Sequence, residues 1–585
     1  MKLKKLFAFA LIPILSLCSL IFVGCNKQVY ADLVVYANFY TGDLDSRAEA
    51  VAVKDGKFIF VGTKADAQKY ITDTTIVKDE STSFGISGFS DAHTHAYVAG
   101  ESEVMHTLEL SNIQSSEGLF SAVEEYVTSN PTKEYYLGYG WNYNLFTNGT
   151  PTKAEFERLN GISSKPIFLK SHDCHSCFVN QAMLDLCEVT KEAQAPEGGI
   201  IEKDADGNLL GTFRDTAMDE LIKSNPNFPR YTVEEYKSII LEAQKIYAKM
   251  GYTAYVDIFI EDEISNDNLC SAYEQLDKAG LLSLKVQAAW TVENKSEEHI
   301  KQVIKHIADR KKECAGGMFE LTDVKFFMDG VGEVGTAYML EAYNPEYKEN
   351  WYGAGRWASN ESKRKLTHAI EQVNRYGLVA HLHAIGDAAM RDGLDAIEEA
   401  QKNYKSDVVK NVITHCEFIA ENDISRFAEL DVVANVDLEW GIKFPGAYET
   451  EVYNLGEERA ISAYPYRSLL NAGALLSFAT DNPCGGTGSP VYGFYIGTHR
   501  GLGVDSSCDR NRSEMLTIQQ AIDCMTIGGA KQMRQDDVRG QIKVGMDADF
   551  VLLSLDLINE TDPLCFLNSE ASLTVVNGKI IYPQA

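Results

Sequence analysis

The sequence predicts an α/β protein: a (β/α)₈ TIM-like barrel with an insertion, plus a small β-sandwich domain built from both chain ends. Strand-like runs alternate with helical stretches through the middle of the chain, which is typical of a parallel sheet or barrel. Short β-prone segments with tight turns lie at both ends. The chain has 585 residues, which exceeds the ~250 that one barrel needs.

The barrel is predicted for residues 84–535 from ten apolar, strand-like runs. Helical stretches such as 233–249, 361–376 and 393–403 separate many of these runs. Ten runs exceed the eight strands of the barrel, so we expect an insertion at about 105–225. The runs are 84–90, 136–139, 166–170, 253–258, 284–289, 324–328, 378–382, 412–414, 432–436 and 475–479.

The composite β domain is predicted for residues 30–83 and 536–585. The first part has strand-like segments on both sides of Asp55-Gly56, a tight hairpin turn signal. The second part has the same character around Asn577-Gly578. We expect the two ends to pair with each other and to leave the middle of the chain as a separate body. The segments are 33–40, 50–53, 57–61, 549–553 and 573–582.

Residues 1–25 resemble a lipoprotein-type signal peptide. A lysine-rich start is followed by an apolar run at 6–23 and then by Gly24-Cys25. In such signals the cysteine is lipidated after cleavage, so Cys25 is the expected lipidation site. The alternative is an uncleaved membrane anchor, because the run approaches the length that spans a bilayer. Either interpretation predicts an extracytoplasmic protein held at the cell membrane.

The charge balance and the cysteines exclude some functions. Asp and Glu number 84 against 54 Lys and Arg, which argues against nucleic acid as a partner because phosphate binding needs a basic surface. The chain has twelve cysteines, and Cys174 with Cys177 forms its single Cys-x-x-Cys pair. No second pair completes a four-cysteine zinc site. We expect scattered buried thiols, although an exported protein could oxidise some of them.

Four histidines and one aspartate lie where barrel strands are predicted to end. His93 and His95 follow the first strand, and residues two apart in an extended segment point the same way. His383, His415 and Asp481 end three later strands. Each alone has a plain alternative, a surface histidine or an aspartate that caps a loop. Catalytic groups of such barrels gather at the carboxyl ends of the strands, so we expect the five side chains to converge on a metal.

From about Ala31 to the end, the chain resembles the amidohydrolase superfamily, and in particular its family 3 branch, which includes N-substituted formamide deformylase. Three departures from the pattern concern the substrate pocket and loop shapes: Ser87 replaces a usual Pro, Cys174 a usual Gly, and Asp215 a common Glu. The matching segments are Gly88 to His95, Gly138 to Trp141, Asp173 to His175 with Asn180, Lys325 to Gly330 with Thr336-Ala337, His383 to Asp387, and Gly540 to Leu553.

The resemblance implies a cofactor of two divalent metals, expected to be Zn²⁺. His93 and His95 would hold one metal, and His383 and His415 the other. Superfamily members with two metals bridge them with a carboxylated lysine, and Lys325 is the matching position. The alternative for Lys325 is an ion pair with a barrel carboxylate such as Asp329.

The resemblance and the strand-end positions also suggest roles in catalysis and substrate binding. Asp481 is both a metal ligand and the residue that would move a proton from water to the leaving nitrogen. His175 is expected to contact the oxyanion or the substrate, and a structural hydrogen bond is its alternative. Trp141 is expected to form a wall of the pocket, and its alternative is a buried position in the hydrophobic core. Asp329 is a further candidate substrate contact.

Two neighbouring histidines fit the family pattern less well. His172 and His381 lie close to His175 and His383 in sequence. His381 shares a strand face with His383 and is expected to support the metal ligands from behind.

The leading hypothesis is therefore a metal-dependent amidohydrolase acting on a small-molecule amide with an N-acyl or N-formyl C–N bond. The first alternative is a non-catalytic lipoprotein that binds a metal or a solute. The presence of Asp481 argues against it, because a binding protein needs no group to move protons. The second alternative is a related hydrolase of esters or phosphoesters, which the fold does not exclude.

Overall fold

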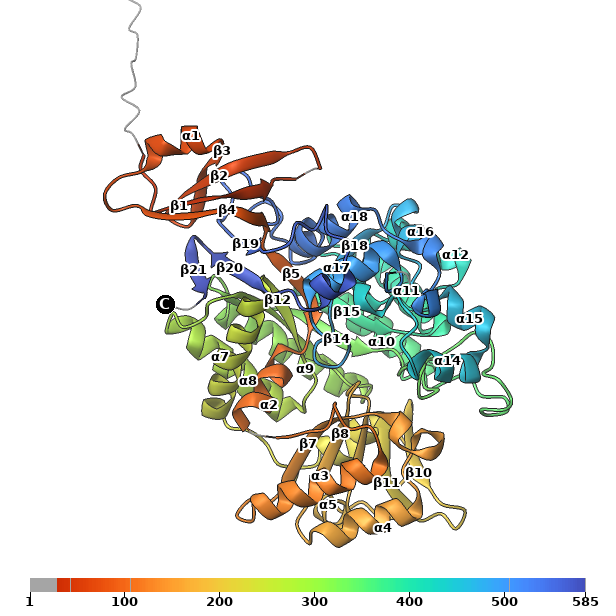
Figure 1. Ribbon diagram of the computed structural model, residues 1–585. Coiled ribbons are helices and arrows are strands. Elements are labelled where there is room, and N and C mark those ends of the chain that lie inside the picture. The colour runs from red at the N-terminus through yellow and green to blue at the C-terminus, as the bar shows by residue number, and fades with distance from the viewer. Residues whose placement is uncertain (1–28, 43, 106, 504–505, 584–585) are drawn as a thin grey trace, which may run out of the picture.

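A computed structural model describes residues 29–42, 44–105, 107–503 and 506–583. It contains three sheets: a parallel barrel in the centre, an inserted sheet on one side, and a sheet made by both chain ends on the other (Figure 1). The predicted signal segment, including Cys25, lies outside the described residues. Within the described ranges, no helix has the length and apolarity needed to cross a membrane.

Eight parallel strands form the barrel in the order β18-β17-β16-β15-β14-β13-β12-β5, which confirms the predicted fold class. All eight residues of β12 are buried, as expected for a parallel strand covered on both faces. The strands are β5 (Phe89–Thr94), β12 (Tyr252–Phe259), β13 (Lys285–Thr291), β14 (Phe319–Phe327), β15 (Val379–Ala384), β16 (Val412–His415), β17 (Val433–Asp437) and β18 (Leu475–Ala479).

The first and last barrel strands meet near their carboxyl ends. The Asp481 N–H donates to the His93 carbonyl at 3.1 Å, and the Thr480 N–H donates to the Asp91 carboxylate at 3.1 Å. These bonds bring the segment after β18 beside β5. The closure of the ring therefore places the most distant of the predicted site residues next to one another.

Helices cover the outside of the barrel (Figure 1). Helix α7 begins with a capping box between Thr232 and Glu235 and ends at Gly251, whose φ of 93° suits glycine. The longer helices are α2 (Ala96–Met105), α7 (Val233–Met250), α8 (Glu263–Lys278), α9 (Glu297–Glu313), α10 (Asn360–Arg375), α11 (Asp387–Asn403), α14 (Ala447–Leu455) and α17 (Pro490–His499). The shorter ones include α12 (Glu421–Ile424), α13 (Arg426–Glu429), α15 (Glu457–Ser462), α16 (Tyr466–Asn471), α18 (Ile518–Asp523) and α19 (Gly529–Gln532).

The insertion lies between β5 and β12 and forms its own six-stranded sheet with a separate hydrophobic core. Two of the ten predicted runs, 136–139 and 166–170, are its strands β7 and β8, and seven others are barrel strands. The run 84–90, predicted as the first barrel strand, instead covers the end of β4 in the terminal sheet and the start of β5. The elements of the insertion are β6 (Leu108–Glu109), α3 (Ser116–Ser129), β7 (Tyr136–Trp141), α4 (Lys153–Ile162), β8 (Ile167–Ser171), β9 (Ser176–Val179), α5 (Gln181–Leu186), β10 (Gly199–Lys203) and β11 (Leu209–Asp215).

The two chain ends pair into one β domain, as predicted. Its strands are hydrogen-bonded into one seven-stranded sheet in the order β21-β20-β19-β4-β1-β2-β3, with a register shift between Tyr36 and Phe39. The strands are β1 (Leu33–Tyr40), β2 (Arg47–Lys54), β3 (Lys57–Gly62), β4 (Ile76–Ser87), β19 (Phe550–Leu553), β20 (Ala571–Val576) and β21 (Lys579–Tyr582), and the helices α1 (Lys64–Ala67) and α20 (Pro563–Leu567) accompany them.

The β domain is tied closely to the barrel. Gly88 alone separates β4 from β5, and a Cβ at this position would lie 2.1 Å from the Thr253 side chain, so only glycine fits. The Lys285 ammonium of β13 contacts the Asp547 and Asp549 carboxylates at 2.7 and 2.6 Å. The first barrel strand, which contains His93 and ends just before His95, is thereby fixed against the β domain.

Candidate active site and metal centre

Seven of the sequence-predicted residues line one cavity at the carboxyl ends of the barrel strands. None is more than 8 % exposed. Six come from the barrel strands or the residues just after them. The seventh, His175, comes from the insertion, between β8 and β9. The seven are His93, His95, His175, Lys325, His383, His415 and Asp481.

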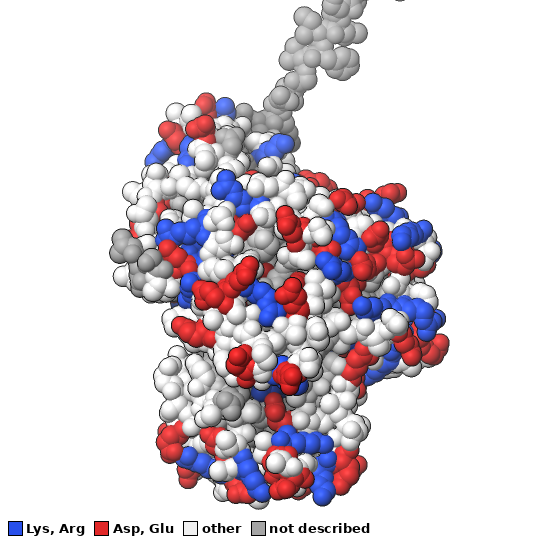
Figure 2. Space-filling model, turned by 90° about the vertical axis from the view of Figure 1, so that its right-hand side faces the viewer, with Lys and Arg blue, Asp and Glu red and all other residues white. Residues whose placement is uncertain are grey.

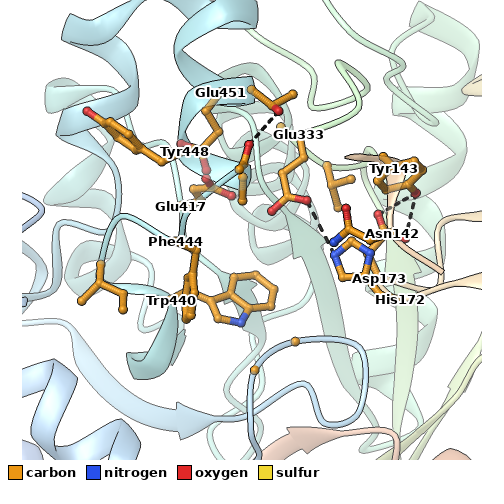
Figure 3. Close-up of a pocket in the computed structure, with 18 of the residues that line it drawn as sticks. Asn142, Tyr143, His172, Asp173, Glu333, Glu417, Trp440, Phe444, Tyr448 and Glu451 are labelled. Atoms are coloured by element: carbon orange, nitrogen blue, oxygen red, sulfur yellow. Dashed lines mark hydrogen bonds and ion pairs between the residues drawn. The ribbon is translucent and has the colours of Figure 1, made fainter. Parts of the chain in front are cut away.

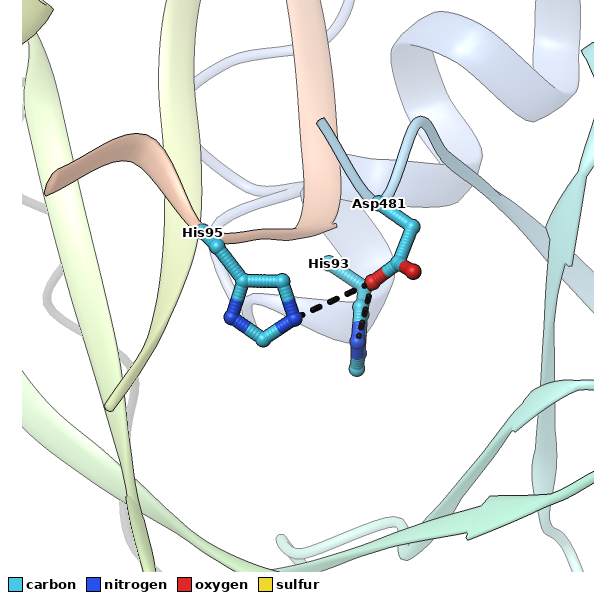
Figure 4. A group of neighbouring side chains, drawn as sticks. All are labelled: His93, His95 and Asp481. Carbon is cyan, nitrogen blue, oxygen red and sulfur yellow. Dashed lines mark ion pairs between the residues drawn. The ribbon is translucent and has the colours of Figure 1, made fainter. Parts of the chain in front are cut away.

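His93, His95 and Asp481 form the tightest group (Figure 4). The Oδ1 atom of Asp481 lies 3.2 Å from Nε2 of His93 and 3.2 Å from Nε2 of His95. One ligand atom from each residue lies within 4.8 Å of the other two. Burial and the Lys325 charge hold the pKa of His93 well below its usual value, so its ring is neutral.

The hydrogen bonds on the far side of each ring determine which nitrogen carries the proton. The Nδ1 of His95 lies 3.0 Å from the Ile258 carbonyl, which only accepts, so Nδ1 is protonated and Nε2 is bare. The Nδ1 of His381 lies 3.1 Å from the Asp323 carboxylate, which leaves His381 Nε2 as an acceptor. His93 Nδ1, 2.8 Å from that Nε2, is therefore the donor, and His93 Nε2 is bare.

Two bare nitrogens thus face the Asp481 Oδ1 atom, which has no hydrogen-bond donor among the described residues. Three acceptor atoms in contact repel one another unless a cation lies between them. Imidazole nitrogens and a carboxylate oxygen are common ligands of zinc and similar metals. The donor set therefore fits a divalent metal.

His383 and His415 are oriented in the same way on the other side of the cavity. His415 Nδ1 donates to the Asp437 carboxylate at 2.8 Å, which leaves its Nε2 bare. His383 Nε2 donates to the Gly330 carbonyl at 3.2 Å, which leaves its Nδ1 bare. The two rings are 4.6 Å apart, and the His415 ring is 5.0 Å from that of His93. The two predicted ligand pairs therefore lie side by side.

Lys325 lies against the first pair. Its Nζ is 3.3 Å from His93 Nε2 and 4.8 Å from the centre of the Phe327 ring. Burial lowers the pKa of Lys325 to about 7, against the pull of Asp481 and Asp437. The alternative partner, Asp329, accepts the N–H groups of Tyr338 and Gly386, each at 2.8 Å, and that of Ile385.

His175 is held by a charged network from the insertion. Its Nδ1 lies 2.6 Å from the Asp215 carboxylate, which also contacts the Arg356 guanidinium at 3.1 Å. Burial lowers the pKa of His175, but the hydrogen bond and charge of Asp215 outweigh it and raise the pKa overall. The Nε2 edge is left for the cavity. His175 can therefore donate a hydrogen bond to an oxygen bound there.

Several site residues have a left-handed backbone. The φ angle is 73° at His415, 53° at Asp481, 50° at Asp215 and 64° at Cys174. For residues other than glycine this conformation costs free energy, and it persists where the surrounding structure imposes it. The surrounding barrel therefore imposes a strained backbone on His415 and Asp481, two of the candidate metal ligands.

The structure places two predicted substrate contacts elsewhere. Trp141 is fully buried in the core of the insertion, where its indole N–H donates to the Leu169 carbonyl at 2.9 Å. Its core alternative therefore fits, and the predicted pocket wall does not. Asp329 lies behind the cavity and 3.6 Å from His383 Nε2. It fixes the turn after β15 and does not reach the space where a substrate would bind.

Other important residues were not identified from the sequence. Asp323 and Asp437 orient His381 and His415, and Arg356 supports Asp215. Asp437 ends a barrel strand, so its position was a usable signal. Cys174 pairs with Cys484 instead of remaining a thiol, with Cα atoms 5.9 Å apart, whereas Cys177 is a buried free thiol. No spacing rule links cysteines 310 residues apart.

Comparison with known proteins agrees with this geometry. The model of the amidohydrolase family matches residues 86–582. The chain is 27 % identical to the putative amidohydrolase YtcJ of Bacillus subtilis, over 96 % of this chain and 100 % of that one. It is 25 % identical to N-substituted formamide deformylase of Arthrobacter pascens, over 90 % of this chain and 94 % of that one.

A solved structure shares the fold. An uncharacterized metal-dependent hydrolase from Pyrococcus horikoshii superposes with a TM-score of 0.69 at 22 % identity, covering 90 % of this chain and 98 % of that one. A similar protein from Pyrococcus furiosus gives a TM-score of 0.66 at 21 % identity, over 90 % and 100 % of the two chains.

We predict that Asp437 sets the metal affinity through His415. Asp437→Leu removes the acceptor that holds Nδ1–H, so the affinity for a divalent metal should fall about 10–100-fold. Asp437→Asn keeps an acceptor oxygen and should recover part of the loss. Competition with a chelator measures the affinity. Asp407→Asn, an exposed site, is the control. An unchanged affinity in Asp437→Leu would show that this contact does not orient a ligand.

Proposed function

The chain belongs to the amidohydrolase family and is a metal-dependent hydrolase, and we propose that it hydrolyses an amide-type C–N bond of a small molecule. The main support is the Asp481 carboxylate, which lies between two proton-free imidazole nitrogens at the cavity floor. The names of two relatives, an amidohydrolase and a deformylase of N-substituted formamides, agree with this bond type.

The residues of this chain divide the chemistry among them. A divalent cation held by these ligands would polarise the substrate carbonyl and lower the pKa of water towards ~7. Asp481 accepts the proton of the attacking water and delivers it to the nitrogen as the C–N bond breaks. A cation bound among His93, His95 and Asp481 would keep the Asp481 carboxylate ionised, so it would start as the base.

His175 acts on the opposite side of the scissile bond. Its Nδ1 is held by Asp215, so the Nε2 edge can donate to the carbonyl oxygen as negative charge develops there. An amine is a poor leaving group unless it is protonated, and this chain supplies both the donor to oxygen and the proton carrier for nitrogen. This division of labour favours catalysis over simple metal binding.

The proposal includes two Zn²⁺ ions and a carboxylated Lys325. His93 and His95 with Asp481 would hold one metal, His383 and His415 the other, and the modified lysine would join them. The neutral Lys325 amine adds to carbon dioxide and loses a proton, which gives an anionic carbamate. Burial lowers the pKa of Lys325 to about 7, so much of this side chain is neutral at physiological pH.

The proposed location is the outer face of the membrane. The basic start, the apolar run and the Gly24-Cys25 junction support a lipid anchor on Cys25. On the face shown in Figure 2, acidic and basic side chains are interspersed.

We predict two metals in the freshly purified protein. Elemental analysis should give two zinc ions per chain, and Lys325→Gln should retain one or fewer because the bridging anion is lost. Lys301→Gln, on the exposed part of α9, should retain both. A full complement in Lys325→Gln would contradict the bridging role of this lysine.

We predict that Asp481→Asn separates binding from catalysis. With N-acyl and N-formyl amides as substrates, kcat should fall about 10²–10⁴-fold, because an amide side chain accepts no proton at neutral pH. KM should change less. Metal content must be measured with kcat, and Asp407→Asn is the control. Undiminished kcat at full metal content would require another base. Cleavage by the unaltered protein of esters but not amides would refute the C–N assignment.

We predict acyl groups on Cys25 of the mature protein. Intact-mass analysis of material extracted from its native membrane should show them, and Cys25→Ser should abolish them. Cys18→Ser alters the same apolar segment and should leave them in place. A native protein without acyl groups would rule out the lipid anchor.

A further inference from the structure

A second, larger cavity adjoins the metal centre. Its volume is about 290 Å³, and it shares Asp173 with the metal cavity. Trp440 forms part of its wall and stacks on the His415 ring at 5.2 Å with an interplanar angle of 4°. A molecule whose reacting bond lies at the metal centre would extend into this space. None of the residues predicted from the sequence as substrate contacts, Trp141, His175 and Asp329, lines it.

Acidic side chains outnumber basic ones in the lining of this cavity. Asp173, Glu333, Glu417 and Glu451 contribute acidic groups, whereas Arg510 is the one arginine among the lining residues and no lysine lines it. In Figure 3 the side chains of Glu333 and Glu417 face the same space above the Trp440 ring. The cavity is therefore acidic beside a centre that also contains Asp481.

Most of the polar groups already have partners within the protein. Arg510 binds the Glu451 carboxylate at 2.5 Å and the Ala460 carbonyl at 2.6 Å. Asp173 accepts from the Tyr143 hydroxyl at 2.8 Å and from the His175 N–H at 3.0 Å. Glu451 and Asp173 are therefore hydrogen-bonded within the protein.

Glu417 is different. The residue is 5 % exposed, and it takes part in no ion pair among the described residues, although it lines the cavity. Among the described residues, the one ion pair of Glu333 is with the His172 imidazole, at 3.7 Å. A buried carboxylate without a counter-charge is costly unless a cation or several donors reach it. The cavity thus contains an acid that forms no ion pair within the described ranges, and its positive neighbour, Arg510, is already bound to Glu451.

The rest of the lining suits a cation with an apolar stem. The rings of Trp440, Phe444 and Tyr448 line the same cavity, and cations bind favourably over aromatic faces. Lys443 and Arg510 already lie over the Tyr448 ring, which leaves Trp440 and Phe444 for a substrate cation.

Burial raises the pKa of Glu451 to about 7 despite Arg510, and the negative charge of Glu333 adds to the rise. A positive group placed among these acids would relieve that repulsion. An anionic group would increase it.

We infer that this cavity binds a positively charged group of the substrate, so that the enzyme acts on amides that carry an ammonium or guanidinium group away from the scissile bond. The inference rests on the proposed function, because it takes the cavity as the site of the non-reacting part of the amide. Glu417 and Glu333 would contact the cation, and Trp440 and Phe444 would enclose its apolar stem.

The test uses two series of amides that differ only at one end. In each pair one member ends in a primary ammonium and the other in a neutral hydroxyl, with the end group on the acyl side in one series and on the amine side in the other. A charge-assisted hydrogen bond is worth ~1.5–3 kcal/mol. The ammonium member of at least one series should therefore have a kcat/KM about tenfold or more above its neutral partner.

Three variants locate the effect. Glu417→Gln and Glu333→Gln should each reduce this preference, mainly through KM. Glu417 is close in sequence to the ligand His415, whereas Glu333 is not close to any metal ligand, so Glu333→Gln tests the cavity without disturbing the metal centre. Glu458→Gln removes the same charge from the exposed surface of α15 and should keep the preference. Equal kcat/KM for both members in the unaltered protein, or a preference that survives both cavity variants, would overturn the inference.

Calorimetry on Asp481→Asn, loaded with metal, separates this inference from the proposed function. If the unaltered enzyme cleaves none of the amides, the proposed function is wrong. The inference would still stand if the ammonium members bind about tenfold more tightly than the neutral ones and Glu417→Gln removes the difference. Equal affinities would refute the inference even if amides are cleaved.

Discussion

The site depends on a proton arrangement that leaves bare imidazole nitrogens facing a carboxylate. Asp323 fixes His381, His381 fixes His93, and the Ile258 carbonyl fixes His95, so that Nε2 of both ligands meets the Asp481 Oδ1 atom. Without a cation these acceptors would repel one another in a buried space. The hydrogen bonds behind the ligands therefore do more than orient rings, because they make the cavity electrostatically incomplete without a metal.

Barrel closure makes this arrangement possible. The contact between β5 and the segment after β18 brings residues 93 and 481 together although the insertion and the other barrel strands separate them in sequence, and Asp91 holds that segment through Thr480. The carboxylate of Asp481 reaches the imidazoles from a left-handed backbone, a conformation that an isolated turn would rarely adopt. Packing of the barrel core stabilises the fold enough to tolerate this local strain. Gly88 and Lys285 connect β5 and β13 to the β domain.

The sequence predicted the parts of the site that follow from local pattern. Residues two apart in a strand share a face, and parallel strands end at one rim, so the sequence alone groups His93, His95, His383, His415 and Asp481. The composite β domain followed from strand-like segments and turns at both ends. Contacts set by packing could not be found in this way. Trp141 belongs to the insertion core, and Asp329 holds a turn. The sequence around each residue does not show how deeply the side chain is buried in the folded protein. The Cys174–Cys484 bond and the Asp215–Arg356 contact join segments far apart in sequence.

The structure separates reaction chemistry from recognition. The barrel strands supply the metal ligands and Asp481, whereas the insertion supplies His175 and Asp173, and the segments after β16 and β17 supply Glu417 and Trp440. Barrel strands are constrained on both faces by packing, so their end residues can change little without loss of the fold. Packing does not constrain loops and an inserted domain on both faces, so their residues can change more freely. The metal centre can therefore stay the same while the second cavity changes, and we infer that Glu417, beside Trp440, sets the substrate preference of this chain.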